Sequence, residues 1–334
     1  MTEYLIPLAL LFVCSGLISY VSTAVVKHAA EKIGLVDRPD ARKQHGTATP
    51  RLGGLAIIFG FGFPLLILAG NERAVALVSK NLAYLFAVLA SGSLIVGLGV
   101  YDDLLGTNAP KKFLLQFAAA FILVSYGFRF DFISVAGQVV NFGVLGVLLS
   151  VLWIVGVINA MNFIDGMDSL ATLVALTIGV AFGAIAVIRH DAFSLVIMVA
   201  LTGSLIGFLP WNRPPAKIFM GDSGSLFIGL LLAAISIARP SKSPAALLIT
   251  GPILALALPV LDTLIVMQKR FGGQHDSLAA RFTRVFTADR NHIHHILVTR
   301  YGSSPKAIFW IWAVTLLFAC AAVLTAMPET KLFG

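Results

Sequence analysis

Long apolar runs separated by short polar segments dominate the chain. A helix needs about 20 apolar residues to cross the hydrocarbon core of a bilayer. On this criterion the pattern predicts an all-α multi-pass membrane protein with about ten transmembrane helices, in which residues 1–334 form a single domain and a short external hairpin fits near 129–141. The predicted spans lie near 5–26, 52–70, 82–100, 113–128, 142–158, 170–188, 192–209, 225–238, 245–267 and 305–326.

The composition and the charges agree with this prediction and orient it. Hydrophobic residues make up 58% of the chain and charged residues only 12%. Most of the 24 lysines and arginines fall in one alternate set of loops, which the positive-inside rule places in the cytoplasm, with both termini outside. The net charge of +8 is therefore an orientation signal in a plasma (inner) membrane protein that contacts membrane lipids, and it implies no nucleic-acid partner.

Five of the 16 acidic residues gather in three segments at the predicted cytoplasmic ends of spans. The first segment, YDDLLG, carries Asp102 and Asp103, and Lys112 follows ten residues later. Adjacent carboxylates repel each other unless a cation lies close. The pair could accept a proton or help to hold Mg²⁺, with the lysine meeting a phosphate. The alternative is a solvated helix end with a basic anchor.

The second segment, NAMNFIDGMDSLA, has four polar residues three positions apart: Asn159, Asn162, Asp165 and Asp168. On a helix or a tight turn this spacing brings the polar groups to one face. Amide and carboxylate oxygens are ligands that Mg²⁺ prefers. Helix capping is the alternative, but four residues exceed what two helix ends require.

The third segment, FMGDSGS, places Asp222 between glycines just before a predicted span. The glycines let the backbone approach a ligand closely, and the N-terminus of the following helix favours phosphate. The resemblance of GDSG to trypsin-like proteases is rejected, because those are soluble β-barrel proteins.

The longest loop, 268–304, contains RNHIHHIL with Arg290, His292, His294 and His295. Imidazole and guanidinium groups donate well to diphosphate oxygens. A structural loop and a zinc site are the alternatives, although HEXXH is absent and no cysteine lies nearby. Asp262, in LPVLDTLIV, lies within a span; an intramembrane acid is a functional candidate, and a packing hydrogen bond explains it equally well.

Together the segments GLVDRPDARKQH, YDDLLG, NAMNFIDGMDSLA, FMGDSGS and NHIHHIL resemble the polyprenyl-phosphate N-acetylhexosamine-1-phosphate transferases, a family that includes the phospho-MurNAc-pentapeptide translocase. The HIHH form and the GLVDRPDARK loop look like the WecA branch. The resemblance implies that GlcNAc-1-phosphate, or another N-acetylhexosamine-1-phosphate, moves from a UDP-N-acetylhexosamine to undecaprenyl or another polyprenyl phosphate. UMP is then released in the first membrane step of a cell-envelope glycan pathway.

The same resemblance implies roles for the residues. Asp222 and Asn162 would bind Mg²⁺, for which Mn²⁺ could substitute, and Asp102 or Asp103 would orient or deprotonate the lipid phosphate. The substrate-binding residues would be Lys112, Asn159, Asp165, Asp168, Arg290, His292, His294 and His295. One departure is Ser169 in GMDS, where the family has GxDG; a small residue there is expected only to shift sugar preference.

Two further interpretations stay open. A secondary transporter could use the aspartates as proton or cation sites, but such sites lie near the bilayer midplane between related halves of the chain. The GSLIG motif at 203–207 predicts a close helix contact, within the chain or in a homodimer.

Overall fold

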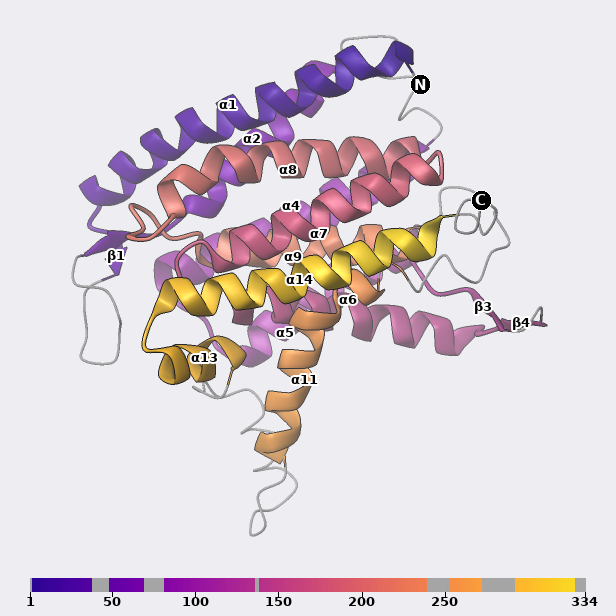
Figure 1. Cartoon of the computed structure of the whole chain (residues 1–334). Helices are drawn as coiled ribbons and strands as arrows, with labels where there is room; N and C mark the ends of the chain where they lie inside the picture. Colours follow the sequence, from indigo (N-terminus) through magenta and orange to yellow (C-terminus); the bar gives the residue numbers. More distant parts are fainter. Residues whose placement is uncertain are drawn as a thin grey trace.

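The structure is a computed structural model that describes residues 2–37, 48–68, 81–135, 138–238, 251, 253–271 and 292–327. It confirms an all-α protein (Figure 1). The helices are α1 (Thr2–Lys32), α2 (Gly53–Leu68), α4 (Leu82–Leu105), α5 (Ala109–Ser125), α6 (Val144–Ile164), α7 (Leu170–Ile188), α8 (Ala192–Asn212), α9 (Gly221–Ile237), α11 (Ala257–Phe271), α13 (Ile293–Tyr301) and α14 (Ser304–Ala326).

Two short antiparallel strand pairs complete the described elements. Strand β1 (Val36–Asp37) pairs with β2 (Thr49–Pro50). Strand β3 (Phe132–Val135) pairs with β4 (Gln138–Asn141), which puts a hairpin within the range 129–141 expected from the sequence. Its position outside the membrane stays a prediction.

Six described helices, α1, α4, α6, α7, α8 and α14, are long and apolar enough to cross a membrane. Helices α2 and α9 are apolar but shorter. The multi-pass membrane architecture is therefore confirmed, whereas ten spans stay a prediction. The predicted span 245–267 lies partly outside the described residues, and the helix described there, α11, begins only at Ala257.

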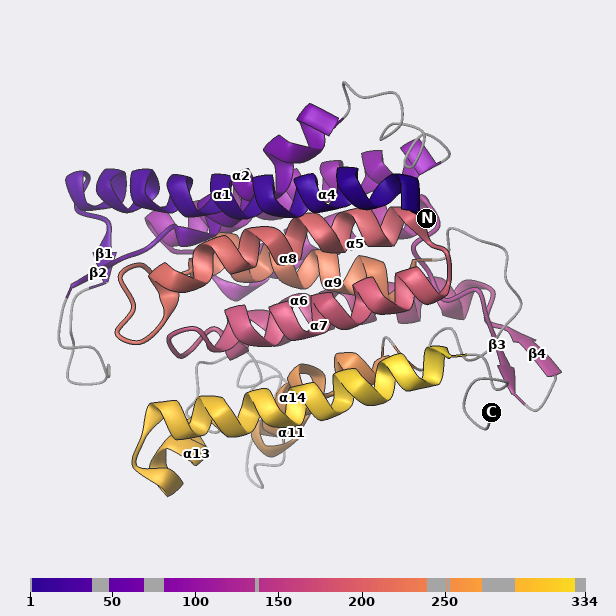
Figure 2. The same ribbon diagram turned by 45° about the horizontal axis from the view of Figure 1, so that its top comes forward.

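Helix α9 forms the centre of the bundle. It packs against α4, α6, α2 and α7, and every residue from Ser223 to Ile237 is buried. Around it, α1 packs on α2 and α8, and α14 packs on α7 (Figure 2). An apolar helix enclosed in this way is stabilised by packing on all its faces.

The GSLIG motif lies in a contact within the chain. A Cβ at Gly203 would meet the carbonyl oxygen of Phe12, and one at Gly207 would meet that of Gly16. Both partners belong to α1, so the motif brings the backbones of α8 and α1 together. It therefore gives no support for a homodimer.

The predicted polar segments lie at one end of the bundle. The β1–β2 pair, the α4–α5 and α6–α7 turns and the segment before α9 meet there, while the β3–β4 hairpin and the start of α1 lie at the other end (Figures 1 and 2). This arrangement agrees with a single site on one membrane face. Helix α11 runs across the direction of α14 and contacts α6 and α14.

Candidate active site

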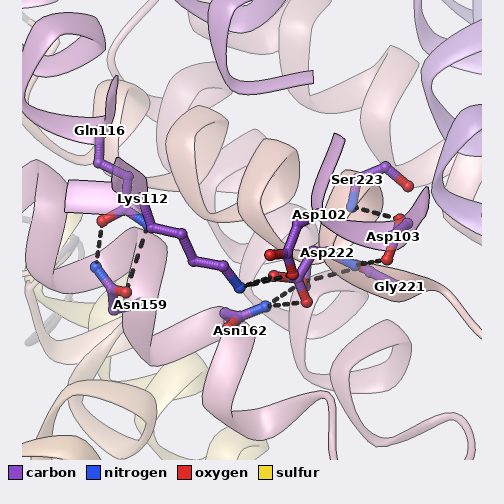
Figure 3. A network of polar contacts seen from close by, with 10 residues as sticks. Asp102, Asp103, Lys112, Gln116, Asn159, Asn162, Gly221, Asp222 and Ser223 are labelled. Atoms are coloured by element: carbon purple, nitrogen blue, oxygen red, sulfur yellow. Dashed lines mark hydrogen bonds and ion pairs between the residues drawn. The ribbon is translucent and has the colours of Figure 1, made fainter. Parts of the chain in front are cut away.

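Four helix ends bring the predicted residues together (Figure 3). Asp102 and Asp103 lie in the last turn of α4, because the helix continues past the predicted span end at residue 100 to Leu105. Lys112 lies in the first turn of α5, Asn162 in the last turn of α6, and Asp222 in the first turn of α9.

Lys112 bridges two of the carboxylates. Its Nζ donates to Asp102 Oδ2 at 2.7 Å and to Asp222 Oδ2 at 2.5 Å. The start of α5 fixes this position, because the Asn108 side chain accepts a hydrogen bond from the backbone N–H of Lys111. The side chains of Lys112, Asp102 and Asp222 are mostly buried, so water screens the repulsion between the two carboxylates poorly. The ammonium group of Lys112 offsets this repulsion.

Asp103 has a different part from its neighbour. Its two oxygens accept the backbone N–H groups of Asp222 at 2.9 Å and Ser223 at 3.0 Å, and its residue is only 8% exposed. These are free N–H groups at the start of α9, so Asp103 caps that helix from α4. Gly99 allows the approach, since a Cβ there would meet the Ser223 backbone.

Asn162 holds the other side of Asp222. Its Nδ2 donates to Asp222 Oδ1 at 3.1 Å and to Ser225 Oγ at 2.9 Å. Ser225 Oγ in turn donates to the carbonyl of Gly221 at 3.1 Å. Every carboxylate oxygen of Asp222 thus has a protein partner.

The side chain of Asn159, one turn before Asn162, is hydrogen-bonded within the bundle. Its Nδ2 donates to Gln116 Oε1 at 2.7 Å and to the Val155 carbonyl at 2.8 Å. Gln116 is fully buried one turn after Lys112 on α5, so the amide pair ties together the helices that carry Lys112 and Asn162. We did not predict Gln116 from the sequence, although a polar residue inside an apolar span was the available signal.

The turn between α6 and α7 carries Asp165 and Asp168. Asp168 Oδ2 accepts the backbone N–H of Ala216 at 2.9 Å, which ties the turn to the segment before α9. Desolvation of the Asp165 carboxyl at this turn, with the charges of Asp222, Asp103 and Asp168, raises its pKa well above the ordinary value.

Asn212, at the end of α8, supports the same turn. Its Oδ1 accepts from the backbone of Ser169 at 3.1 Å and from Thr172 Oγ1 at 2.8 Å, while its Nδ2 donates to the Ile218 carbonyl at 3.1 Å. Ser169 has φ 62°, in the left-handed region that favours glycine. The backbone conformation therefore explains why glycine suits this position.

The start of α2 lies against the segment before Asp222. Gly53 N–H donates to the Phe219 carbonyl at 2.9 Å, and Gly54 N–H to the Met220 carbonyl at 2.7 Å. A Cβ at Gly54 would collide with the backbone of Gly224. The glycine pair thus lets α2 hold the start of α9 through main-chain contacts.

Two of the predicted histidines reach the end of α6. The His292 ring lies 5.1 Å from the Phe163 ring, and the His294 ring stacks on His292 at 5.9 Å. A Cβ at Gly166 would lie 2.6 Å from His294 Nε2, so His294 packs on the α6–α7 turn. Arg290 and the side chain of His295 lie outside the described residues.

The described residues contain no group of three or more His, Cys, Asp or Glu side chains arranged to hold a metal ion. They therefore give no support to the zinc alternative. Mg²⁺ is commonly held by one or two carboxylates together with substrate phosphates and water. Asp222, with Asp102 and the Asn162 amide beside it, provides hard oxygen ligands of this kind, and Lys112 shows that this point attracts positive charge.

Comparison with known proteins identifies the family of the chain. The family model described as "Glycosyl transferase family 4" matches residues 85–239, which include the three acidic segments. The chain is 33% identical over 326 residues to a probable undecaprenyl-phosphate N-acetylglucosaminyl 1-phosphate transferase of Bacillus subtilis, covering 96% of this chain and 86% of that protein. The chain therefore belongs to this family of membrane-embedded sugar-phosphate transferases.

Other relatives represent both branches of the family. A decaprenyl-phosphate N-acetylglucosaminephosphotransferase of Mycobacterium leprae is 33% identical over 348 residues, covering 96% of this chain and 85% of that protein. A phospho-N-acetylmuramoyl-pentapeptide-transferase of Oceanobacillus iheyensis is 32% identical over 339 residues, covering 97% of this chain and 98% of that protein. The resemblance noted in the sequence to the polyprenyl-phosphate N-acetylhexosamine-1-phosphate transferases is confirmed, and the transporter alternative gains no support.

Proposed function

We propose that the protein transfers N-acetylglucosamine-1-phosphate from UDP-N-acetylglucosamine to a polyprenyl phosphate, such as undecaprenyl phosphate, and releases UMP. The observation that carries this proposal is the match along almost the whole chain to transferases whose names specify N-acetylglucosamine and a polyprenyl phosphate. The meeting of Asp102, Lys112 and Asp222 at one end of the bundle supports it.

In the proposed reaction, an oxygen of the polyprenyl phosphate attacks the β-phosphorus of the UDP-sugar. The bond from this phosphorus to the oxygen shared with the α-phosphate breaks, so UMP leaves and a lipid-linked diphosphate sugar forms. Phosphoryl transfer depends mainly on positioning and on stabilising negative charge. The second pKa of a phosphate monoester is about 6, so the attacking oxygen is already ionised near neutral pH. A single displacement then requires no general base.

We assign the metal position to Asp222 and Asn162, as the sequence analysis did. Bound there, Mg²⁺, or Mn²⁺ in its place, would neutralise charge on the diphosphate. Asn162 would turn its amide oxygen rather than its nitrogen towards the ion, an exchange of two groups of nearly equal shape.

The hydrogen bonds separate the parts of the two adjacent acids. Asp103 uses both oxygens to hold the start of α9, so it positions Asp222. Asp102 instead shares Lys112 with Asp222 and has no contact with the start of α9 among the described backbone hydrogen bonds. We therefore assign the orientation of the lipid phosphate to Asp102 and Lys112 rather than to Asp103.

The donor side of the site would be formed by the α6–α7 turn and α13. Asp165 and Asp168 would hold the nucleotide-sugar, and His292 and His294, which pack on the end of α6 and the turn after it, would meet its diphosphate. Arg290 and His295 keep the same predicted part. Asn159 would act through Gln116 by holding α5 against α6.

The proposed topology has ten spans, a cytoplasmic active site and both termini outside. The support is that the acidic segments share one end of the bundle (Figure 1). UDP-sugars are made in the cytoplasm, where a site at this membrane face would meet them.

The test is UMP release by the purified protein in detergent with UDP-N-acetylglucosamine, polyprenyl phosphate and Mg²⁺. Asp222→Asn is expected to abolish turnover at saturating substrate. Asp131→Asn is the matched control, because Asp131 is an exposed acid paired with Arg129 next to the β3–β4 hairpin, at the other end of the bundle. Absence of UMP with every UDP-amino sugar tried would refute the proposed function.

A further inference from the structure

A buried acid outside the acidic segments contacts one of the predicted diphosphate-binding histidines. Asp262 lies in α11 and is 6% exposed. Its Oδ2 lies 2.9 Å from Nδ1 of His292, which is 5% exposed, and its Oδ1 accepts the backbone N–H of Ile293 at 2.8 Å. Both carboxylate oxygens therefore hold the start of α13.

These two contacts fix the backbone and the ring together. His292 is the N-cap residue of α13, and its own side chain does not cap the helix. The Ile293 N–H at the first turn would lack an intrahelical acceptor, and Asp262 supplies one from a neighbouring helix. The acid therefore determines where α13 begins and how the His292 ring is turned.

The same contacts determine which ring nitrogen is available to a ligand. An ionised carboxylate can only accept hydrogen bonds, so Nδ1 of His292 must carry a hydrogen. Nε2 is then the nitrogen left for a ligand. A ring held between the Asp262 carboxylate and a phosphate oxygen must donate from both nitrogens, which only the doubly protonated ring can do.

The ring held in this way lies against the rest of the site. Its neighbour Phe163 stands on α6 between Asn162 and Asp165, and the stacked His294 packs on Gly166 in the turn that follows. A displacement of His292 would therefore change the donor side of the site, whereas the Lys112 bridge between α4, α5 and α9 has no contact with Asp262 among the described hydrogen bonds.

We propose that Asp262 is a positioning residue for the transfer reaction. It holds His292 by Nδ1 so that Nε2 donates to the diphosphate of the nucleotide-sugar. This inference rests on the proposed function, in which His292 meets that diphosphate.

Asp262→Asn tests the proposal with little change of shape. Asparagine has one acceptor oxygen, which the Ile293 N–H requires, so its NH₂ group faces His292 and moves the ring hydrogen to Nε2. The bound ring then has no carboxylate to support a second proton. The ring still donates from Nε2, but as a neutral group, and losing the charge assistance of this hydrogen bond is expected to weaken UDP about 10-fold as a competitive inhibitor. Uridine, which lacks phosphate, should bind as it does to the unchanged protein.

Two further measurements separate positioning from a structural effect. Thr263→Val is the matched control, because Thr263 is buried on the same helix and bonds only to the Pro259 carbonyl among the described contacts. It should leave the inhibition constants of UDP and uridine unchanged. His292→Gln should cost less UDP affinity in Asp262→Asn than in the unchanged protein, because the charge of the ring is already lost there.

The ¹⁵N spectrum of histidine-labelled protein tests the proposal without any variant at position 262. The signals of His292 are assigned from their loss in His292→Gln. A hydrogen on Nδ1 is expected, and a ring protonated only on Nε2 would overturn the proposal. If Asp262→Asn weakened UDP and uridine equally, or left the inhibition constant of UDP unchanged, the proposal would also be overturned, although the unchanged protein would still release UMP. No UMP release by the unchanged protein would instead refute the proposed function.

Discussion

Gly221→Ala should disable the site through the hydrogen bonds that hold Asp222. Gly221 has φ +73°, and a Cβ there would lie 2.7 Å from both oxygens of Asp103. A relaxed carbon–oxygen contact requires about 3.3 Å, so the carboxylate must move by about 0.6 Å. The two charge-assisted hydrogen bonds to the start of α9 contribute about 1.5–3 kcal/mol each when intact. Left-handed strain adds about 1–2 kcal/mol.

Gly34→Ala provides the matched control, because Gly34 has φ +71° and nothing within 4 Å of a Cβ. Both variants should unfold at lower temperature, and Gly221→Ala at the lower of the two. A displacement of about 1 Å at a reacting group costs about 100-fold in rate, so UMP release by Gly221→Ala should fall about 10- to 100-fold. Gly34→Ala should keep its turnover. Equal melting temperatures and normal turnover in Gly221→Ala would refute the claim that Asp103 positions Asp222.

Three other predictions concern the same end of the bundle. Lys112→Ala should lower turnover about 100-fold, because it removes the ammonium group between Asp102 and Asp222. Lys111→Ala alters the exposed neighbour and should keep nearly the turnover of the unchanged protein. Similar losses in both variants would contradict a role for the Lys112 bridge. Ser169→Gly should raise the unfolding free energy by about 0.5–1 kcal/mol, measured by denaturant titration, and leave the relative rates with different UDP-sugars unchanged. The pKa of Asp165 in the folded protein lies above the ordinary 3.8, so the protein loses stability as the pH rises from about 4 and this carboxyl ionises. Without Mg²⁺, Asp165→Asn should therefore raise the melting temperature at neutral pH and leave it unchanged below pH 4. A difference in melting temperature that does not depend on pH would contradict this prediction.

The sequence predicted the parts of the site that depend on position along a span. Apolar runs located the helices, and their alternation placed Asp102, Asp165 and Asp222 at one end before any contact was known. Hydrophobicity did not locate the polar helix ends, because a helix continues through polar residues when its backbone is hydrogen-bonded. Asp102 therefore lies inside α4, and Asn162 inside α6.

Contacts between distant segments could not be derived from the sequence. The Asp262 carboxylate required a partner, but only the folded positions of α11 and α13 bring it to His292, 30 residues away. The part of Asp103 depends on a positive φ at Gly221, which composition does not reveal. At Ser169, the difference from the family pattern was interpreted as sugar preference, and the structure shows a left-handed backbone there.

The central position of α9 has a mechanical consequence. A helix enclosed along its whole buried length cannot tilt or rotate without disturbing α2, α4, α6 and α7 together, so Asp222 moves only with the entire bundle. Among the described helices, α11 packs on α6 and α14, and α13 packs on α14, at the edge of the bundle. The protein therefore carries Asp222 at a stiff centre, whereas the Asp262–His292 pair lies on helices at its edge.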